Sequence, residues 1–274
     1  MKLGRNIRLR REEMNMTQEE LAEKMNVSFQ AVSAWERDVY LPETENLFRL
    51  SEILRTTADA LADEQRTQFQ YQKTVFDPER MKTYIKTTAR AHGMTDTLKA
   101  MDFASEKHAG MTRKNSDIPY IYHPMTVACH ALAMGLYEDD IAAACLLHDT
   151  VEDCGVRPEE LPVNKRVQNL VVLLTKNRKP MESREQAIQR YYEAIQSDPA
   201  ACLVKCIDRC NNLTTMSWGF DRSGKLHYIE ETEQYYPTLL RIIKKEPRFF
   251  SAAWLLKYQI ESMLDIYKHL MEQR

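Results

Sequence analysis

The sequence contains few of the residues that mark strands and tight turns: seven glycines occur among 274 residues, and the ten prolines are scattered. Because β-branched residues rarely cluster either, we predict an all-α chain. No apolar run reaches the length needed to cross a membrane, and residues 1–6 lack the apolar core of a signal peptide. These absences predict a cytoplasmic protein without membrane contact.

Cysteine is also sparse, and the net charge is close to zero. Without a secretion signal, the six cysteines are expected to be reduced thiols. Cys202, Cys206 and Cys210 recur every fourth residue along one helix face. A metal site is one interpretation of this spacing, and small core side chains are the favoured one. The net charge of −2 gives no whole-chain indication of nucleic-acid or membrane binding.

The stretch that organises the chain begins with the apolar run 142–147, which predicts a buried helix. His148, Asp149, Glu152 and Asp153 follow it directly. Burying such groups is costly unless a bound cation compensates their charge. On one continuous helix, Glu152 lies four residues after His148, and Asp153 lies four after Asp149. All four side chains would then face one cavity.

Two further residues complete a candidate ligand set. His123 precedes Pro124 at a predicted helix start, and Asp208 is the internal carboxylate of the largely apolar helical run 203–209. Two imidazoles and two carboxylates suit a borderline divalent metal such as manganese, iron or zinc. Each residue alone is more often a core histidine or a surface carboxylate. The four together favour a metal site, held by His123, His148, Asp149 and Asp208.

Taken in order, these segments resemble the HD-domain phosphohydrolases and, more narrowly, the hydrolase domain of RelA/SpoT-type alarmone enzymes. The matching segments are residues 108–114, 119–124, 144–153 and 205–213. The resemblance implies a bound divalent metal, with Mn²⁺ the expected ion, that activates water for attack at the 3′-phosphorus of (p)ppGpp. Glu152 and Asp153 would orient that water or accept its proton. Bifunctional relatives carry a synthetase domain afterwards, and this chain stops at Arg274, so we expect hydrolysis only.

The resemblance also implies nucleotide contacts in the predicted loop 111–122. A cation in the family's loop stacks on guanine, and Arg113 or Lys114 lies at that place. Tyr120 belongs to the same matching segment and is assigned to the nucleotide as well. The loop lacks the family's glycine, so another 3′-phosphorylated nucleotide, or the ribose-phosphorylated NADPH, is a second candidate substrate. A solvated basic loop is the alternative without function.

Three residues around Asp208 are further candidates for nucleotide binding. Lys205 and Arg209 flank Asp208 and would either bind phosphate or pair with carboxylates. Asn212 follows Asp208 by one helical turn, so both can face the metal cavity. Thr214 stands where the family often has arginine, which removes one expected phosphate or packing contact.

Residues 1–66 carry the pattern of a helix-turn-helix. Thr17 and Glu20 form a capping box for a helix over 18–25, and Ser28 caps the next helix, which runs to about Arg37. The sequence of residues 18–36 closely resembles that of the five-helix domain of XRE/Cro-like repressors. The resemblance implies binding of double-stranded DNA.

If the second helix enters a major groove, its exposed amino-terminal side chains reach the base edges. Gln30 can pair with adenine and Phe29 can touch a thymine methyl, whereas Val32 and Trp35 should face inward. The predicted contacts are Ser28, Phe29, Gln30 and Ser33 to bases, and Gln18 and Arg37 to phosphates. Residues 1–66 contain ten basic and thirteen acidic side chains, a net charge of −3. We therefore expect weak monomer binding, and a homodimer on a pseudo-palindromic operator.

The predicted domains are a helix-turn-helix domain over 1–66, a linker and leading helix over 67–93, and a hydrolase domain over 94–274. Asp77 and Pro78 start the leading helix. Two classes of function are open. The first is an enzyme whose helix-turn-helix positions or regulates it. The second is a transcription regulator whose HD domain senses a nucleotide without turnover. The complete ligand set and the Glu152–Asp153 pair favour the enzyme. A helix-turn-helix kept for protein contacts alone is the alternative for residues 1–66.

Overall fold

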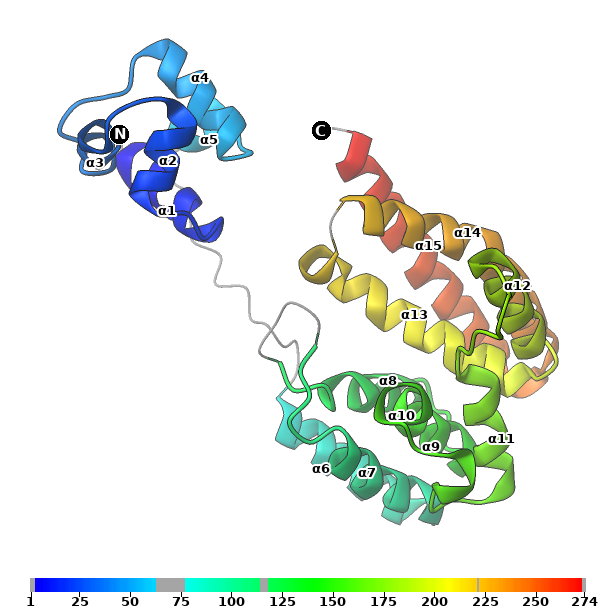
Figure 1. Cartoon of the computed structure of the whole chain (residues 1–274). Helices are drawn as coiled ribbons and strands as arrows, with labels where there is room; N and C mark the ends of the chain where they lie inside the picture. Colours follow the sequence, from blue (N-terminus) through cyan, green and yellow to red (C-terminus); the bar gives the residue numbers. More distant parts are fainter. Residues whose placement is uncertain (1–2, 63–76, 114–117, 221, 273–274) are drawn as a thin grey trace. The chain divides into compact units, whose positions relative to one another are not determined.

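A computed structural model describes residues 3–62, 77–113, 118–220 and 222–272 (Figure 1). The chain divides into two compact units, residues 1–72 and 73–274. Within the described residues the regular structure is helical, apart from one isolated bridge between Thr112 and Pro119. The all-α prediction is confirmed. No described helix is both long and apolar enough to span a membrane.

The first unit forms its helices where the capping residues predict them. Thr17 and Glu20 make the reciprocal capping box, and the Ser28 hydroxyl accepts a hydrogen bond from the Ala31 amide. Val32 and Trp35 are buried, as predicted, in a core shared by the helices of this unit. The described helices are α1 (Leu3–Glu13), α2 (Gln18–Met25), α3 (Phe29–Glu36), α4 (Thr44–Ile53) and α5 (Ala58–Ala62).

The second unit begins with a helix capped by Asp77, whose carboxylate accepts from the Arg80 amide. Its described helices are α6 (Pro78–Ala91), α7 (Thr95–Lys107), α8 (Tyr122–Ala133), α9 (Asp139–Leu147), α10 (Thr150–Cys154), η1 (Pro158–Glu160), α11 (Lys165–Leu174), α12 (Arg184–Ile195), α13 (Pro199–Gly219), α14 (Arg222–Lys245), η2 (Pro247–Phe249) and α15 (Phe250–Glu272).

Helix α9 is the central element of the second unit, because every residue from Ile141 to Leu147 is buried and α7, α8, α11 and α13 all pack on it. Its first residue, Asp139, accepts hydrogen bonds from the amides of Asp96 and Thr97 and so caps the start of α7. Helix α13 also packs on α8, α14 and α15 (Figure 1). Cys202, Cys206 and Cys210 are buried free thiols on α13, which confirms that they are core side chains.

One predicted helix is interrupted. Helix α9 ends at Leu147, and α10 begins only at Thr150, so His148 and Asp149 lie in a turn rather than on one continuous helix. This break matters for the site, because it lets both side chains of the His148–Asp149 pair turn inward. Farther along the chain, the Asn164 side chain accepts from the Val167 amide and starts α11 as a helix separate from η1.

Candidate active site

The four predicted metal ligands come together from three elements of the second unit. His123 lies near the start of α8, His148 and Asp149 lie in the turn between α9 and α10, and Asp208 lies on α13. The Nε2 atom of His123 is 3.1 Å from Asp208 Oδ1, 3.3 Å from His148 Nε2 and 3.6 Å from Asp149 Oδ2. The Nε2 atom of His148 is 3.2 Å from Asp149 Oδ2 and 3.6 Å from Asp208 Oδ1. Each of the two imidazole Nε2 atoms therefore lies within 3.6 Å of both carboxylates.

The donor set fits a divalent cation. The Nδ1 atom of His148 lies 2.9 Å from the carbonyl oxygen of Cys145 and donates to it, which leaves the lone pair of Nε2 facing the other ligands. Although burial lowers the pKa of His148, Asp149 and Asp208 raise it to about 10. A proton on His148 thus balances the two carboxylates when no cation does. The ligand atoms of His123, His148 and Asp149 all lie within 4.8 Å of one another, which is close enough for them to hold one metal ion.

Four neighbouring side chains hold the two ligand carboxylates in place. The Asn212 amide donates to Asp208 Oδ1 at 2.6 Å, and Arg113 Nη2 donates to Asn212 Oδ1 at 2.9 Å. On the other oxygen of Asp208, Lys205 Nζ donates at 2.7 Å. Asp149 receives the Tyr120 hydroxyl at 2.7 Å. The predicted nucleotide residues Arg113, Tyr120, Lys205 and Asn212 are therefore all within this cluster, and Lys114 lies outside the described residues.

Tyr120 is held between other rings of the site. The His108 ring stacks on it with centroids 4.8 Å apart, and the Arg113 guanidinium lies 5.7 Å from its centroid. Burial, followed by the charge of Asp149, raises the pKa of Tyr120, so its hydroxyl stays protonated and donates. In the sequence, His108 stands out only as the first residue of the matching segment 108–114. Its position at the end of α7, beside the loop, does not indicate that its ring stacks on Tyr120.

Glu152 and Asp153 lie on α10, at the exposed edge of the site. The Lys176 amide donates to Glu152 Oε2 at 2.8 Å, which fixes this carboxylate against the segment after α11. Burial of the carboxyl group, with the nearby charge of Asp149, raises the pKa of Glu152 above its usual value. A carboxylate with a raised pKa accepts a proton more readily near neutral pH.

Arg209 is not part of the cluster. Its guanidinium is buried, donates to Glu231 and to the hydroxyls of Tyr192 and Tyr236, and lies 3.6 Å from the Tyr228 ring centroid. The structure therefore favours a carboxylate pair for this residue over a phosphate contact. Glu231, which sequence reasoning missed, also lies 3.9 Å from Lys176 Nζ.

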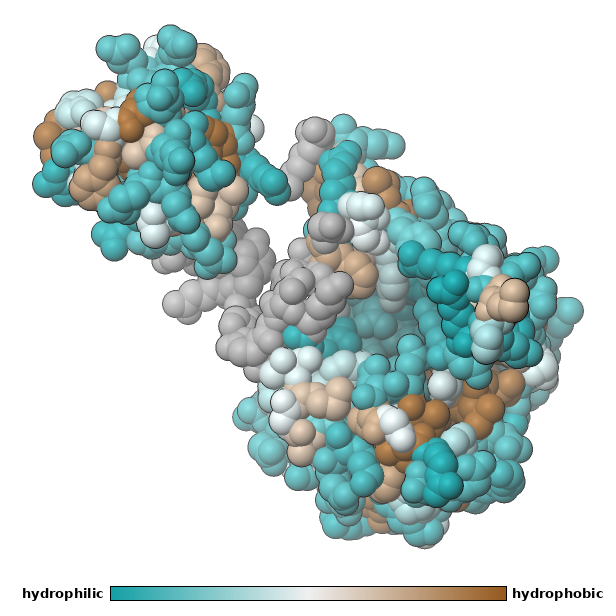
Figure 2. Space-filling view, viewed as in Figure 1, coloured by the Kyte–Doolittle hydropathy of each residue, from teal (hydrophilic) through white to brown (hydrophobic). Residues whose placement is uncertain are grey.

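The surface of the second unit is hollowed between α13 and the α8–α10 segment. Figure 2 shows this hollow and the hydrophilic residues that line it. Burial lowers the pKa of Lys176, and its Nζ lies 5.4 Å from the Tyr191 ring centroid. Lys205 Nζ lies 5.6 Å from the same ring. Two lysines thus share one aromatic neighbour, and one of them, Lys205, also pairs with Asp208.

In the first unit, some of the side chains predicted to contact DNA are exposed, and others already form hydrogen bonds within the unit. Phe29, Gln30 and Arg37 are exposed on or beside α3, and Ser33 is half-buried. Ser28 is exposed and uses its hydroxyl as the helix cap. Gln18 donates to Glu36 Oε2 at 2.7 Å, so its amide is already used inside the unit.

Three of the four arginines of α1 are used in the same way. Arg11 pairs with Glu36 through two hydrogen bonds, Arg10 donates to the carbonyl oxygens of Leu54 and Arg55, and Arg8 pairs with Glu12. Few cations therefore remain for phosphates on this helix.

Comparison with known proteins identifies relatives of both units. Residues 7–61 match the helix-turn-helix family model, and residues 100–239, half of the chain, match the HD domain model. A guanosine-3′,5′-bis(diphosphate) 3′-pyrophosphohydrolase of Aquifex aeolicus is 34% identical over 60% of this chain and 22% of its own length. The Mus musculus protein of the same description is 32% identical over 54% of this chain and 82% of its own length.

Longer proteins and one solved structure are also similar. A GTP pyrophosphokinase of Brucella ovis is 36% identical over 52% of this chain and 19% of its own length. This chain therefore spans about a fifth of the two long bacterial relatives. A solved structure described as a metazoan ortholog of SpoT that hydrolyses ppGpp matches with a TM-score of 0.50 and 20% identity, over 63% of this chain and 95% of that one. This likeness concerns the fold alone.

Proposed function

The chain belongs to the HD-domain family, and we propose that its second unit is a divalent-metal-dependent hydrolase that removes the 3′-pyrophosphate from (p)ppGpp. One observation supports the proposal: the Nε2 atoms of His123 and His148 lie within 3.6 Å of the carboxylates of Asp149 and Asp208, and Lys205 pairs with Asp208. The relatives named for the same reaction support the choice of substrate.

The residues around the metal ligands have distinct tasks in this reaction. A divalent cation, which we propose to be Mn²⁺, would activate a water molecule and polarise a phosphoryl oxygen when bound. Glu152 accepts the proton of the attacking water, since its pKa is raised and its position is fixed by the Lys176 amide. Attack at the 3′-phosphorus breaks its bond to the ribose oxygen, releases pyrophosphate and leaves GDP or GTP.

The cations of the site would bind the charged ends of the substrate. Lys205 pairs with Asp208, and Lys176 lies beside Glu231 and shares the Tyr191 ring with Lys205, so both can neutralise phosphate oxygens. Arg113 reaches the site through Asn212, and its guanidinium can leave that amide to lie against a purine face. Asp153 would hold the water together with Glu152.

The assay that tests this proposal measures release of pyrophosphate from ppGpp and pppGpp, and of phosphate from NADPH, with Mn²⁺ present and then chelated. We expect metal-dependent pyrophosphate release from the guanosine substrates. Phosphate release from NADPH alone would move the assignment to a nucleotide that carries its phosphate on the 2′ oxygen of the ribose. Binding of ppGpp without any turnover would instead favour a regulator that senses the nucleotide.

We further propose that the first unit binds double-stranded DNA as a homodimer. The match to a helix-turn-helix over 7–61 and the exposed Phe29 and Gln30 at the start of α3 support this proposal. Selection of genome fragments at low salt tests it, and a sequence that is pseudo-palindromic is the expected product. Enrichment of no sequence would leave α3 as a protein-binding surface.

A further inference from the structure

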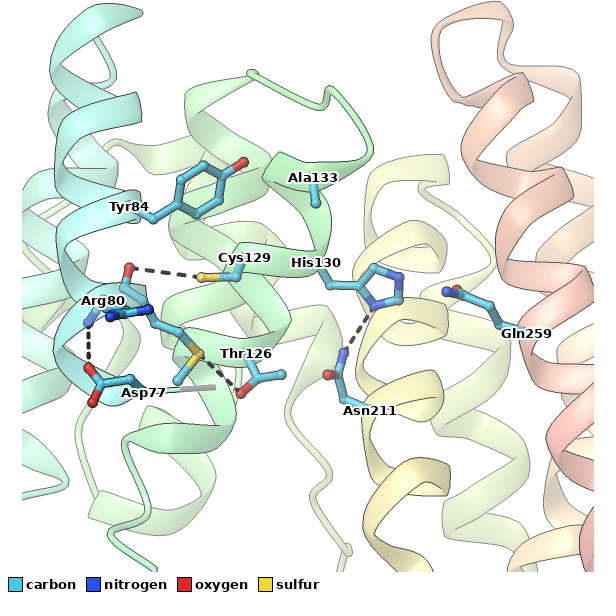
Figure 3. A pocket seen from close by; sticks show the side chains of 10 residues that line it. Asp77, Arg80, Tyr84, Thr126, Cys129, His130, Ala133, Asn211 and Gln259 are labelled. Carbon is cyan, nitrogen blue, oxygen red and sulfur yellow. Dashed lines mark hydrogen bonds between the residues drawn. The ribbon is translucent and has the colours of Figure 1, made fainter. Parts of the chain in front are cut away.

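A second cavity of the HD unit lies between α6, α8, α13 and α15 (Figure 3). Its volume is about 610 Å³, within the range of small-molecule sites. It shares no lining residue with the metal site described above, so occupancy here is independent of whether that site hydrolyses a nucleotide. The lining residues are Asp77, Arg80, Met81, Tyr84, Thr126, Cys129, His130, Ala133, Asn211 and Gln259.

His130 presents a hydrogen-bond donor to this cavity. The Asn211 Nδ2 atom is fixed as a nitrogen because it donates to the Ile207 carbonyl oxygen at 2.9 Å. The same nitrogen lies 3.2 Å from His130 Nδ1, which therefore accepts. Burial lowers the pKa of His130, so the ring is neutral and its single proton is on Nε2. That buried N–H meets no acceptor at full hydrogen-bond geometry within the described part of the chain, and the Gln259 side chain beside it partly offsets the lowering of the pKa.

A buried donor without an acceptor is costly, and a bound ligand would supply the missing acceptor. Gln259 adds a second donor from the opposite wall. Its Oε1 accepts from the Cys210 thiol at 3.4 Å, which leaves its amide nitrogen for another contact. Figure 3 shows the Gln259 amide directed toward the His130 ring from α15. The inner end of the cavity therefore presents two neutral hydrogen-bond donors to a ligand.

The other end of the cavity differs in chemistry. Arg80 is exposed, and no carboxylate among the described residues forms an ion pair with its guanidinium. Tyr84 is 40% exposed and offers an aromatic face next to the thioether of Met81 and the thiol of Cys129. A ligand that matches all of these features has a flat apolar body, carbonyl-type acceptors at one end and a negative charge at the other.

We propose that this cavity binds a nucleoside 5′-monophosphate whose base carries a carbonyl group. The base carbonyl accepts from His130 Nε2 and Gln259, the ring lies between Tyr84 and Met81, and the phosphate pairs with Arg80. Each contact uses a group that the fold leaves without a partner or exposed to the cavity.

Calorimetric titration of the full chain tests the proposal, with a chelator present to weaken nucleotide binding at the metal site. The probes are UMP, GMP and AMP, with uridine and ribose 5-phosphate as partial ligands. UMP or GMP should bind one per chain, and each partial ligand should bind about tenfold or more weakly than the whole. Equal binding of ribose 5-phosphate would overturn base recognition, and absence of binding by all probes would overturn the site.

Matched variants locate the bound nucleotide. His130→Leu removes the donor and should weaken binding about tenfold or more, whereas His130→Gln keeps an N–H donor and should weaken it less. Arg80→Ala, on the surface, gives a second test if His130→Leu is poorly folded. Arg113→Ala, in the metal site, should leave this binding unchanged. Binding that is lost in Arg113→Ala and kept in both His130→Leu and Arg80→Ala belongs to the metal site and would refute the proposal.

Discussion

Each unit buries a cluster of charged side chains, and the two clusters differ in whether their charges cancel. In the first unit, Arg11 and Glu36 form a two-fold hydrogen-bonded pair, at 2.6 Å and 3.0 Å, and both are buried. The remaining donors are also used: Arg11 Nη1 donates to the Met16 carbonyl oxygen, and Gln18 donates to Glu36. Charge and hydrogen bonds are complete within the protein, so this cluster has a structural role.

The cluster of the second unit is incomplete in the same terms. Asp149 and Asp208 both approach the two imidazoles, and Lys205 pairs with Asp208. Within the described residues, the charge of Asp149 is balanced only by a proton on His148, which a bound cation would replace. A buried excess of charge is costly and persists where a cation or substrate completes it. Whether the buried charges are balanced within the protein, rather than how deeply they are buried, therefore distinguishes a structural cluster from a functional one.

Removing a ligand carboxylate should have the largest effect on this comparison. Asp149→Asn eliminates one negative charge and one ligand, so bound metal and turnover should be lost, with turnover reduced by roughly 10³-fold or more. Helix content should be largely kept, because the new side chain has nearly the same shape. Metal analysis, circular dichroism and the pyrophosphate assay measure the three quantities. Normal turnover by a metal-stripped Asp149→Asn protein would contradict the assignment.

Breaking the Arg11–Glu36 pair should instead reduce stability and leave hydrolysis unchanged. Glu36→Gln leaves the Arg11 charge buried without its partner, which should destabilise the first unit by about 3–5 kcal/mol. Amide hydrogen exchange in α1 and α3 measures the loss. Glu45→Gln, at an exposed position of α4, is the matched control and should change stability by less than about 0.5 kcal/mol. Hydrolysis should be unaffected by either variant, and a parallel loss of turnover would show that the two clusters are coupled.

Acid should weaken the buried Arg209–Glu231 pair. Burial raises the pKa of Glu231, but Arg209 and Lys176 outweigh it and lower the pKa to about 2. The stabilisation is therefore complete above the usual pKa of a glutamate and is lost as the pH falls toward 2. The lost free energy is roughly 3 kcal/mol. Urea unfolding from about pH 6 down to about pH 3 should show a smaller acid dependence in Glu231→Gln than in the unaltered chain. If stability fell equally with pH in the two proteins, the Arg209–Glu231 pair would not contribute to the loss of stability in acid.

Glu152→Gln separates the chemical step from metal binding. The variant should keep its metal but lose roughly 10²-fold or more in kcat, because the amide cannot accept the proton of water. Glu159→Gln, exposed nearby on η1, is the control and should retain kcat. Weakened metal binding with an unchanged kcat would make Glu152 a ligand instead.

Local sequence signals predict much of this fold. The bounds of α2 agree with the predicted 18–25, because the capping box of Thr17 and Glu20 marks its start and an apolar face marks its length. The end of α9 at Leu147 is not predictable in this way. No breaker residue interrupts 142–153, and the turn arises where His148 and Asp149 point into a site shared with α8 and α13.

Tertiary pairing limits the prediction of the site in the same way. Lys205 precedes Asp208 by three residues, and neighbours at that spacing share a helix face, whereas adjacent residues such as Asp208 and Arg209 do not. Helical geometry alone therefore distinguishes the two cations. The partner of Arg209 could not be found, because Glu231 lies on another helix and its buried position depends on how α14 packs on α13.

The smallest effects are expected in DNA binding, where the compensation of the first unit has a consequence. Because Arg8, Arg10 and Arg11 are paired within the unit, few cations remain to displace counterions, and the salt dependence of binding should be shallow. Gln30→Ala should cost about 1–3 kcal/mol and relax specificity at one base pair. Arg37→Ala should weaken all sequences alike, since a phosphate contact carries no base information. Fluorescence anisotropy on a selected operator and on its point variants, at several salt concentrations, measures all three quantities. A steep salt dependence would mean that the arginine pairs of α1 open on DNA, and the charge compensation seen in this unit would then be a property of the free protein alone.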